Sequence, residues 1–208
     1  MQVIQVEIGF YSTNCYILYC AETLKAAIID PAGQEKGLLE LIEEKNLDVK
    51  YIINTHGHVD HIGANGAIKQ AKDALILIHE EDAPMLTSYD KNLSIFVGKG
   101  VLGGVADKLI NDGDIIEFGN VKLNVIHTPG HTKGGICLYN EKEKTLFSGD
   151  TLFAESIGRT DFPGGSYKTI IKSIKEKLFI LPDETVVYPG HGEMTTIKHE
   201  KQYNPFVS

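Results

Sequence analysis

The chain has 208 residues, 42% hydrophobic and 23% charged, a composition that excludes global disorder and allows one sizeable core. The formal net charge of −8 disfavours a nucleic-acid partner, because phosphate binding depends on clustered Lys and Arg. No apolar run approaches the roughly 20 residues of a membrane span, and the first ten residues do not resemble a signal peptide. The three scattered cysteines indicate reduced thiols. We therefore expect a single domain over residues 1–208, located in the cytoplasm.

The first half of the chain alternates short apolar runs with amphipathic segments. Strands are predicted over 3–8, 16–19, 26–29, 49–53 and 75–78, and helices over 35–45, 64–71 and 81–88. Residues 91–108, with four glycines, predict a long loop of the kind that covers a site.

The second half repeats this order. Strands are predicted over 115–118, 122–127, 136–139, 145–148 and 185–188, and helices over 167–177 and 196–203. Because each half of the chain has strands followed by a helix, the sequence favours two sheets packed together with helices outside.

The segment His56-Gly57-His58-Val59-Asp60-His61 is the strongest chemical signal. It follows the apolar strand over 49–53 directly, so four potential ligands can converge on one place. His56 and His58 can chelate one ion together, and Asp60 with His61 can serve a second ion. A polar turn with surface histidines is the alternative.

Three further segments make that alternative weak. Each ends an apolar strand with a glycine followed by a potential ligand: Gly130-His131, Gly149-Asp150 and Gly190-His191. Glycine suits a sharp turn out of a strand, and active-site groups are commonly carried on loops at one end of a sheet scaffold. The sequence therefore predicts one metal site built from four loops.

These segments resemble the metallo-β-lactamase superfamily, nearly from end to end. Within it, the runs Gly149–Phe153 and Gly158–Gly165 resemble the glyoxalase II group, the hydroxyacylglutathione hydrolases, in a single-domain form. The resemblance implies an α+β fold: a four-layer αββα sandwich in which two mixed sheets pack face to face with helices outside.

The resemblance also implies a binuclear metal centre. His56, His58 and His131 would hold one divalent ion, Asp60, His61 and His191 a second, and Asp150 would bridge them. The expected metal is zinc, with iron or manganese as alternatives, because imidazole and carboxylate suit all three.

The expected function is hydrolysis of a thioester, S-lactoylglutathione or another acyl thioester, by a hydroxide that bridges the metals. Asp60 would also be catalytic, because it can hydrogen-bond and orient that hydroxide. The expected partner is a small-molecule thioester, with no nucleic acid and no membrane; the oligomeric state stays open.

The chain departs from glyoxalase II around the substrate. It ends at Ser208, before the helical region that helps to bind glutathione there, and Glu193 stands where that family has a tyrosine. Arg159 is a candidate substrate-binding residue, since a guanidinium binds carboxylates; an ion pair with Asp161 is the alternative for it.

Two other functions stay open. One is a persulfide dioxygenase that uses a single Fe(II) in a facial triad of Asp150 with two histidines, His56 and His131 or their neighbours. The other is a non-enzymatic metal-binding domain, which the seven intact ligand positions disfavour.

Overall fold

The computed structural model describes residues 1–98 and 100–207. The strands are β1 (Gln2–Ile8), β2 (Thr13–Tyr19), β3 (Lys25–Ile29), β4 (Asp48–Ile53), β5 (Leu75–His79), β6 (Lys108–Ile110), β7 (Ile115–Phe118), β8 (Val121–His127), β9 (Ile136–Asn140), β10 (Thr145–Gly149), β11 (Leu152–Phe153), β12 (Ser156–Ile157), β13 (Val186–Pro189) and β14 (Thr195–Thr196). The α-helices are α1 (Glu35–Glu44), α2 (Val59–Ile62), α3 (Asn65–Lys72), α4 (Tyr167–Ser173) and α5 (Ile197–Tyr203). Shorter turns are the 3₁₀ segments η1 (Ala83–Met85) and η2 (Ser94–Val97) and the π segment η3 (Ile174–Leu178).

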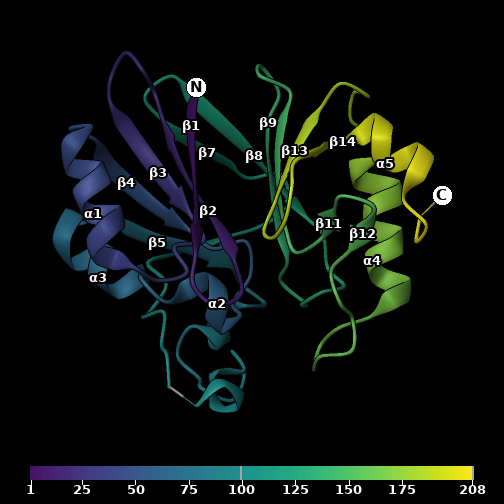
Figure 1. Ribbon diagram of the computed structural model, residues 1–208, viewed down its shortest axis with the longest axis horizontal. Coiled ribbons are helices and arrows are strands. Elements are labelled where there is room, and N and C mark those ends of the chain that lie inside the picture. The colour runs from purple at the N-terminus through teal and green to yellow at the C-terminus, as the bar shows by residue number, and fades with distance from the viewer. Residues whose placement is uncertain (99, 208) are drawn as a thin grey trace.

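The described residues form two six-stranded mixed sheets, with orders β1-β2-β3-β4-β5-β6 and β14-β13-β10-β9-β8-β7, and a small hairpin of β11 and β12. Figure 1 shows the two sheets side by side, with α1 and α3 outside the first and α4 and α5 outside the second. This arrangement confirms the predicted four-layer αββα sandwich, which buries an apolar stripe on each helix and both faces of each sheet.

Three apolar clusters separate the four layers. Strand residues alternate between them, because neighbouring side chains of a strand point to opposite faces: Ile28 packs toward α1 and α3, whereas Ala27 and Ile29 pack between the sheets. The third cluster joins the second sheet to α4 and α5, through residues such as Ile170 and Ile197. Strands buried on both faces read as continuous apolar runs, which is why the sequence predicts them well.

The strand directions position the site. Strands β8 and β10 each pair antiparallel with β9, and β10 pairs parallel with β13, so β8, β10 and β13 all run the same way. Their carboxyl ends therefore lie at the same end of the second sheet. The carboxyl end of β4, in the first sheet, lies close to them. The first residues of β2 close the gap between the sheets, because Thr13 forms an isolated bridge with His191.

The differences from the predicted elements are local. Short strands β6, β11, β12 and β14 were not predicted, since two or three residues carry no periodicity. The helix predicted over 81–88 is reduced to the 3₁₀ turn η1. The long loop predicted over 91–108 contains η2, and residues 91–98 and 100–107 are called the lobe below. Position 99 lies outside the described residues. Among the described residues, none of the helices has both the length and the apolar character needed to cross a lipid bilayer.

Candidate metal centre

The histidine-rich segment leaves β4 and enters α2 directly, so it brings four side chains to the sheet edge at once. His56, His58 and His61 are each at most 5% exposed, and Asp60 lies beside them, partly exposed. Gly57 keeps this segment compact, because a Cβ there would overlap the side chain of Met85 and the backbone of Asp82.

Each of the other three predicted ligands follows the carboxyl end of a strand in the second sheet. His131 follows β8, Asp150 follows β10 and His191 follows β13. Gly190 is required for this approach, because a Cβ at that position would overlap Asp150 Oδ1 and contact the His61 ring. The structure therefore brings all seven sequence-predicted ligand side chains into one cluster.

The cluster contains three groups whose ligand atoms lie within 4.8 Å of one another: His56, His58 and His131; Asp60, His61 and His191; and His56, His61 and Asp150. The first two groups are the two predicted triads. His58 Nδ1 lies 3.0 Å from His131 Nε2, and His61 Nε2 lies 3.3 Å from His191 Nε2.

Asp150 lies between the two triads. Its Oδ2 is 3.6 Å from both His131 Nε2 and His191 Nε2, and its Oδ1 is 3.5 Å from His61 Nε2. Oδ2 thus lies beside one histidine of each triad, which is the position that a bridging residue needs.

Hydrogen bonds outside the cluster fix the orientation of four imidazoles. The Nδ1 atoms of His131 and His191 donate to the carbonyls of Arg159 at 2.7 Å and Tyr11 at 3.0 Å. His61 Nδ1 lies 3.0 Å from Asp30 Oδ2, and His56 Nδ1 lies 3.3 Å from the Thr55 hydroxyl. Each of these rings therefore turns Nε2 into the cluster, the arrangement that metal-binding histidines normally show.

Two buried carboxylates hold the ligand loops in place. Asp30 accepts hydrogen bonds from Thr55 N at 2.8 Å and Thr55 Oγ1 at 2.6 Å, besides contacting His61. Asp82 accepts from Gly57 N at 3.3 Å, Thr132 Oγ1 at 2.7 Å and Gly134 N at 2.7 Å, and so ties the loop after β4 to the loop after β8. Burial raises the pKa of Asp82, although these hydrogen bonds oppose the increase.

Two imidazoles of the first triad, His56 and His58, are held in the uncharged form. Burial, with the neighbouring His131 ring, lowers the pKa of His58 to about 3. Burial and the adjacent His61 and His58 rings also keep the pKa of His56 well below its ordinary value. These imidazoles carry lone pairs at neutral pH, which is the form that binds metal.

The second triad is charged. Burial opposes protonation of His61, but the charges of Asp150, Asp60 and Asp30 outweigh it and raise its pKa to about 10. The pKa of His191 is raised in the same way, against burial, by its hydrogen bond with Asp60. His61 and His191 in turn hold the pKa of Asp60 well below its usual range, although burial acts in the opposite direction.

The donor set fits divalent metal ions. His56 Nε2 and Asp150 Oδ1 are buried and have no hydrogen-bond partner among the described residues. Such orphaned atoms are costly unless something binds them, and five imidazoles with two carboxylates are the ligands that zinc, iron and manganese accept.

The comparisons agree with this geometry. Residues 8–191 match the family model described as "Metallo-beta-lactamase superfamily". The chain belongs to the metallo-beta-lactamase superfamily. Among curated relatives, it is 37% identical to hydroxyacylglutathione hydrolase GloC of Haemophilus influenzae, over 100% of this chain and 99% of that protein.

Three solved structures that are similar to this chain carry names that describe different proteins. The BLEG-1 B3 metallo-beta-lactamase has a TM-score of 0.94 and 35% identity, covering 100% of both chains. TTHA1623 in a di-iron-bound form has a TM-score of 0.88 and 33% identity, covering 98% of this chain and 100% of that one. ETHE1 from Myxococcus xanthus has a TM-score of 0.85 and 31% identity, covering 100% of this chain and 84% of that one.

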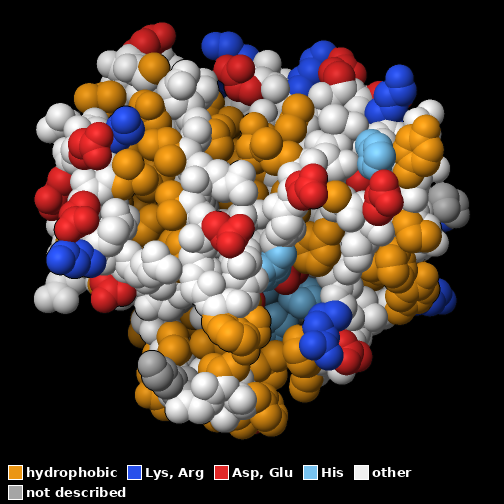
Figure 2. Space-filling model, in the orientation of Figure 1, with side chains coloured by type: hydrophobic (Ala, Val, Ile, Leu, Met, Phe, Trp, Pro, Cys, Tyr) orange, Lys and Arg blue, Asp and Glu red, His pale blue; other side chains and the backbone are white. Residues whose placement is uncertain are grey.

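A pocket of about 630 Å³ opens onto the cluster and is lined by His58, Asp60, His131, Asp150 and His191 on one side. In Figure 2 histidine side chains are visible in a hollow between an apolar lobe and a basic side chain. Arg159 also lines this pocket, but its Nε and Nη2 donate to Asp161 at 2.8 and 2.6 Å, and its guanidinium lies 3.9 Å from the Phe162 ring centroid. The alternative that the sequence left open for Arg159, an ion pair with Asp161, is present.

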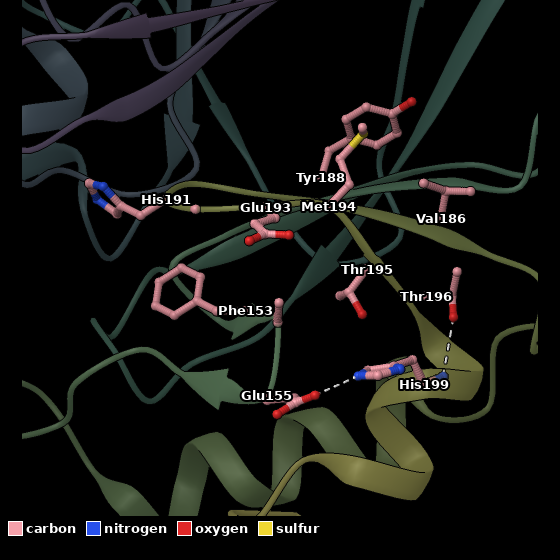
Figure 3. A pocket seen from close by; sticks show the side chains of 12 residues that line it. Phe153, Glu155, Val186, Tyr188, His191, Glu193, Met194, Thr195, Thr196 and His199 are labelled. Atoms are coloured by element: carbon pink, nitrogen blue, oxygen red, sulfur yellow. Dashed lines mark hydrogen bonds and ion pairs between the residues drawn. The ribbon is translucent and has the colours of Figure 1, made fainter.

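A second cavity, a groove of about 880 Å³, lies on the other side of His191 and shares Phe153 and His191 with the pocket. Figure 3 shows Glu193 and Met194 on one side of this groove and Glu155, bonded to His199, on the other. Glu193, which stands where glyoxalase II has a tyrosine, is exposed and lines this groove.

Several residues that shape this site carry no recognisable sequence pattern. Asn14 donates from Nδ2 to the carbonyls of Pro189 and Gly192 and so fixes the His191 loop, although it lies just before the strand predicted over 16–19. Asp82 and Phe96 also went unnoticed. The bonds of Asp82 to Thr132 and Gly134 and that of Asn14 to Pro189 join distant parts of the chain, which no local pattern reports.

Proposed function

We propose that this superfamily member is a metal-dependent hydrolase that cleaves acyl thioesters. The observation that carries the proposal is the cluster of seven ligand side chains with orphaned atoms, open to a pocket large enough for a substrate. The name of the H. influenzae relative, a hydroxyacylglutathione hydrolase, supports the same chemistry.

In this proposal His56, His58 and His131 hold one ion, Asp60, His61 and His191 hold a second, and Asp150 contacts both. Zinc is the expected metal, and iron is the principal alternative because a related structure is in a di-iron-bound form. When bound, such ions supply Lewis acidity and lower the pKa of water toward neutrality.

The protein's own groups position the reaction. Asp60 Oδ2 lies 3.4 Å from His191 Nε2 and 3.7 Å from His61 Nε2, and the Asp60 side chain also lines the pocket. Its carboxylate can accept a hydrogen bond from the attacking water and direct the water's oxygen to the carbonyl carbon. The new C–O bond replaces the C–S bond, one water proton leaves with the thiolate sulfur, and the products are a carboxylic acid and a thiol.

Glutathione is proposed as a tolerated rather than a preferred thiol. Glu193 places a carboxylate, where glyoxalase II has a tyrosine, beside the groove next to the cluster. Glutathione thioesters are anionic, so this charge weakens their binding. We expect hydrolysis of S-lactoylglutathione with a high KM.

The decisive assay follows thiol release from S-lactoylglutathione and from uncharged thioesters by the metal-loaded protein. Release that depends on metal supports the proposal. A fully loaded protein that releases thiol from none of them would refute it.

One rival is favoured by a specific observation. His56, His61 and Asp150 form a group of two imidazoles and one carboxylate, the facial triad of non-heme Fe(II) oxygenases. A persulfide dioxygenase built on this group would consume oxygen in the presence of a persulfide when loaded with one Fe(II). A non-enzymatic metal-binding domain would bind metal but show neither activity.

A further inference from the structure

The wall of the 630 Å³ pocket that faces the metal ligands is apolar. Its side chains are Val59, Leu93, Phe96, Val97, Phe153 and Phe162. Phe96 is 76% exposed, and Tyr11, which also lines the pocket, is 50% exposed. Large apolar side chains gathered at one exposed place normally mark a binding site. Figure 2 shows hydrophobic side chains gathered beside the hollow in which histidines are visible.

The lobe that carries Leu93, Phe96 and Val97 is built rigidly from within. Asn92 and Ser94 are fully buried; Asn92 Nδ2 donates to Val101 O at 2.8 Å, and Ser94 N donates to Asn92 Oδ1 at 2.9 Å. Val59 N, beside the ligands His58 and Asp60, donates to Asn92 O at 2.9 Å. The lobe is therefore fastened to the metal-binding loop, and its apolar side chains hold a defined position beside the cluster.

Leu93 shows that this position costs free energy. Its φ is +67°, in the left-handed region that branched side chains rarely adopt. Backbone strain of this kind persists where the surrounding structure enforces it, and it concentrates at binding sites and active sites. Leu93 also lines the pocket, so the strained residue is part of the apolar wall.

Charge gives the pocket its selectivity. Arg159 is the one Lys or Arg among the described lining residues, and its guanidinium is already bonded to Asp161 and stacked on Phe162. Phe162 in turn lies against His58, with ring centroids 5.5 Å apart. Away from the metal ligands, an anionic group would meet no unpaired Lys or Arg among the described lining residues, whereas a hydrocarbon chain would contact the apolar side chains of the wall.

We propose that this wall binds the acyl chain of the substrate, so that the protein prefers thioesters of apolar, straight-chain acids over 2-hydroxyacyl thioesters. The inference rests on the proposed thioesterase function and names its substrate class. Biological thiols carry polar or charged groups, so the apolar part of a thioester is its acyl chain. The groove that contains Glu193 lies on the other side of His191, where the polar thiol part would leave the cluster.

The test is a chain-length series from acetyl to hexanoyl on one uncharged thiol, N-acetylcysteamine. Each methylene buried against the wall should raise kcat/KM by up to about fourfold, and the lactoyl thioester should fall below the butyryl one. A kcat/KM that is flat or falls with chain length, or that is highest for the lactoyl thioester, would overturn the inference.

Phe96→Ala locates the effect. It should lower kcat/KM for the hexanoyl thioester by about tenfold and for the acetyl thioester by less than about twofold, because only the long chain reaches the ring. Ile180→Ala is the matched control, since Ile180 is also 76% exposed but lies outside the pocket. An equal loss for all chain lengths, or a change of oligomeric state with no change in chain-length preference, would show that Phe96 does not bind the acyl chain.

A binding measurement separates this inference from the proposed function. Acetate, butyrate and hexanoate should bind the metal-loaded protein with affinity that rises with chain length, and Phe96→Ala should abolish the rise. If no thioester is hydrolysed but this rise is seen, the apolar pocket stands and the thioesterase proposal fails. If thioesters are hydrolysed without any rise in binding, the thioesterase proposal stands and the apolar pocket fails.

Discussion

The two triads of the cluster use the same ligand chemistry in opposite electrostatic states. The first, His56, His58 and His131, consists of buried imidazoles; burial keeps the pKa of His56 and His58 low, so these two rings are unprotonated at neutral pH. The second, Asp60, His61 and His191, contains a carboxylate, and charges around it raise the pKa of both imidazoles. A metal ion meets unprotonated rings at His56 and His58 of the first triad and must displace protons at the second. The two proposed metal sites should therefore differ in how strongly protons compete with metal.

Asp150 is the residue that both triads share, so its removal should have the largest effect. Asp150→Ala should lower kcat/KM for thioesters by at least about 10³-fold, more than the loss of a single transition-state donor, and should weaken metal binding at both triads. Metal titration with activity measured in parallel checks this. Asp183→Ala, an exposed carboxylate paired with Lys201, is the control and should change neither. Loss of metal from one triad alone would rule out the bridging role.

Single histidine variants should separate the triads. His56→Ala should remove metal mainly from the first triad and abolish hydrolysis, whereas His191→Ala should weaken mainly the second. Metal content of each purified variant, expected to approach one ion per chain instead of two, measures this. If the wild-type protein is fully active with one ion, the assignment of two sites is wrong.

The pH dependence of metal binding should distinguish the two triads directly. His61, with a pKa raised to about 10, is protonated at neutral pH, so metal binding at the second triad releases a proton and its affinity should rise about tenfold per pH unit up to that pKa. At the first triad His58, with a pKa near 3, has no proton to release, so affinity there should stay nearly constant above neutral pH. Titrations of His56→Ala and His191→Ala between about pH 7.5 and 9 isolate each triad. Equal slopes for both variants would contradict the electrostatic difference.

The carboxylates behind the triads should have intermediate effects. Asp30→Asn removes the charge that faces His61 Nδ1, and should weaken metal binding at the second triad by about 10- to 100-fold. Asp82→Asn disturbs the contacts to Gly57 and Gly134 and should act mainly on the first triad. Metal affinities with thermal unfolding of each loaded variant check this. Equal weakening of both triads by either variant would show that these residues support the fold as a whole.

Arg159→Ala should have the smallest effect. The guanidinium is paired with Asp161 at the exposed rim, where such pairs contribute little, and KM for S-lactoylglutathione should rise by less than about threefold. Steady-state kinetics of this variant beside Asp161→Ala check it. A large increase in KM for anionic substrates alone would restore the role of Arg159 as a carboxylate-binding residue.

Much of the fold follows from the sequence because its signals are local. Strands β4, β8, β10 and β13 are largely apolar runs followed closely by a potential ligand, so both their position and the ligands beyond their ends can be predicted. The convergence of His131, Asp150 and His191 needs only that their strands share one direction, and the layered fold provides this.

What the sequence could not predict depends on partners far along the chain. Asp82 precedes Pro84, a pattern that predicts the start of a helix, but its carboxylate bonds to Thr132 and Gly134 and provides no cap, so only the turn η1 forms. Asn14 supports the His191 loop across more than 170 residues. The lobe around Leu93 has no periodicity, and its backbone is held by bonds from Asn92 and Ser94 that no sequence pattern reports.

The most direct test of the whole account is thiol release from a neutral acyl thioester by the protein loaded with zinc, before and after chelation. The account predicts one thiol and one carboxylic acid per thioester consumed, loss of turnover on chelation, recovery on reloading, and no turnover by Asp150→Ala. A protein carrying two ions per chain that releases no thiol, or one whose turnover survives complete removal of metal, would contradict it.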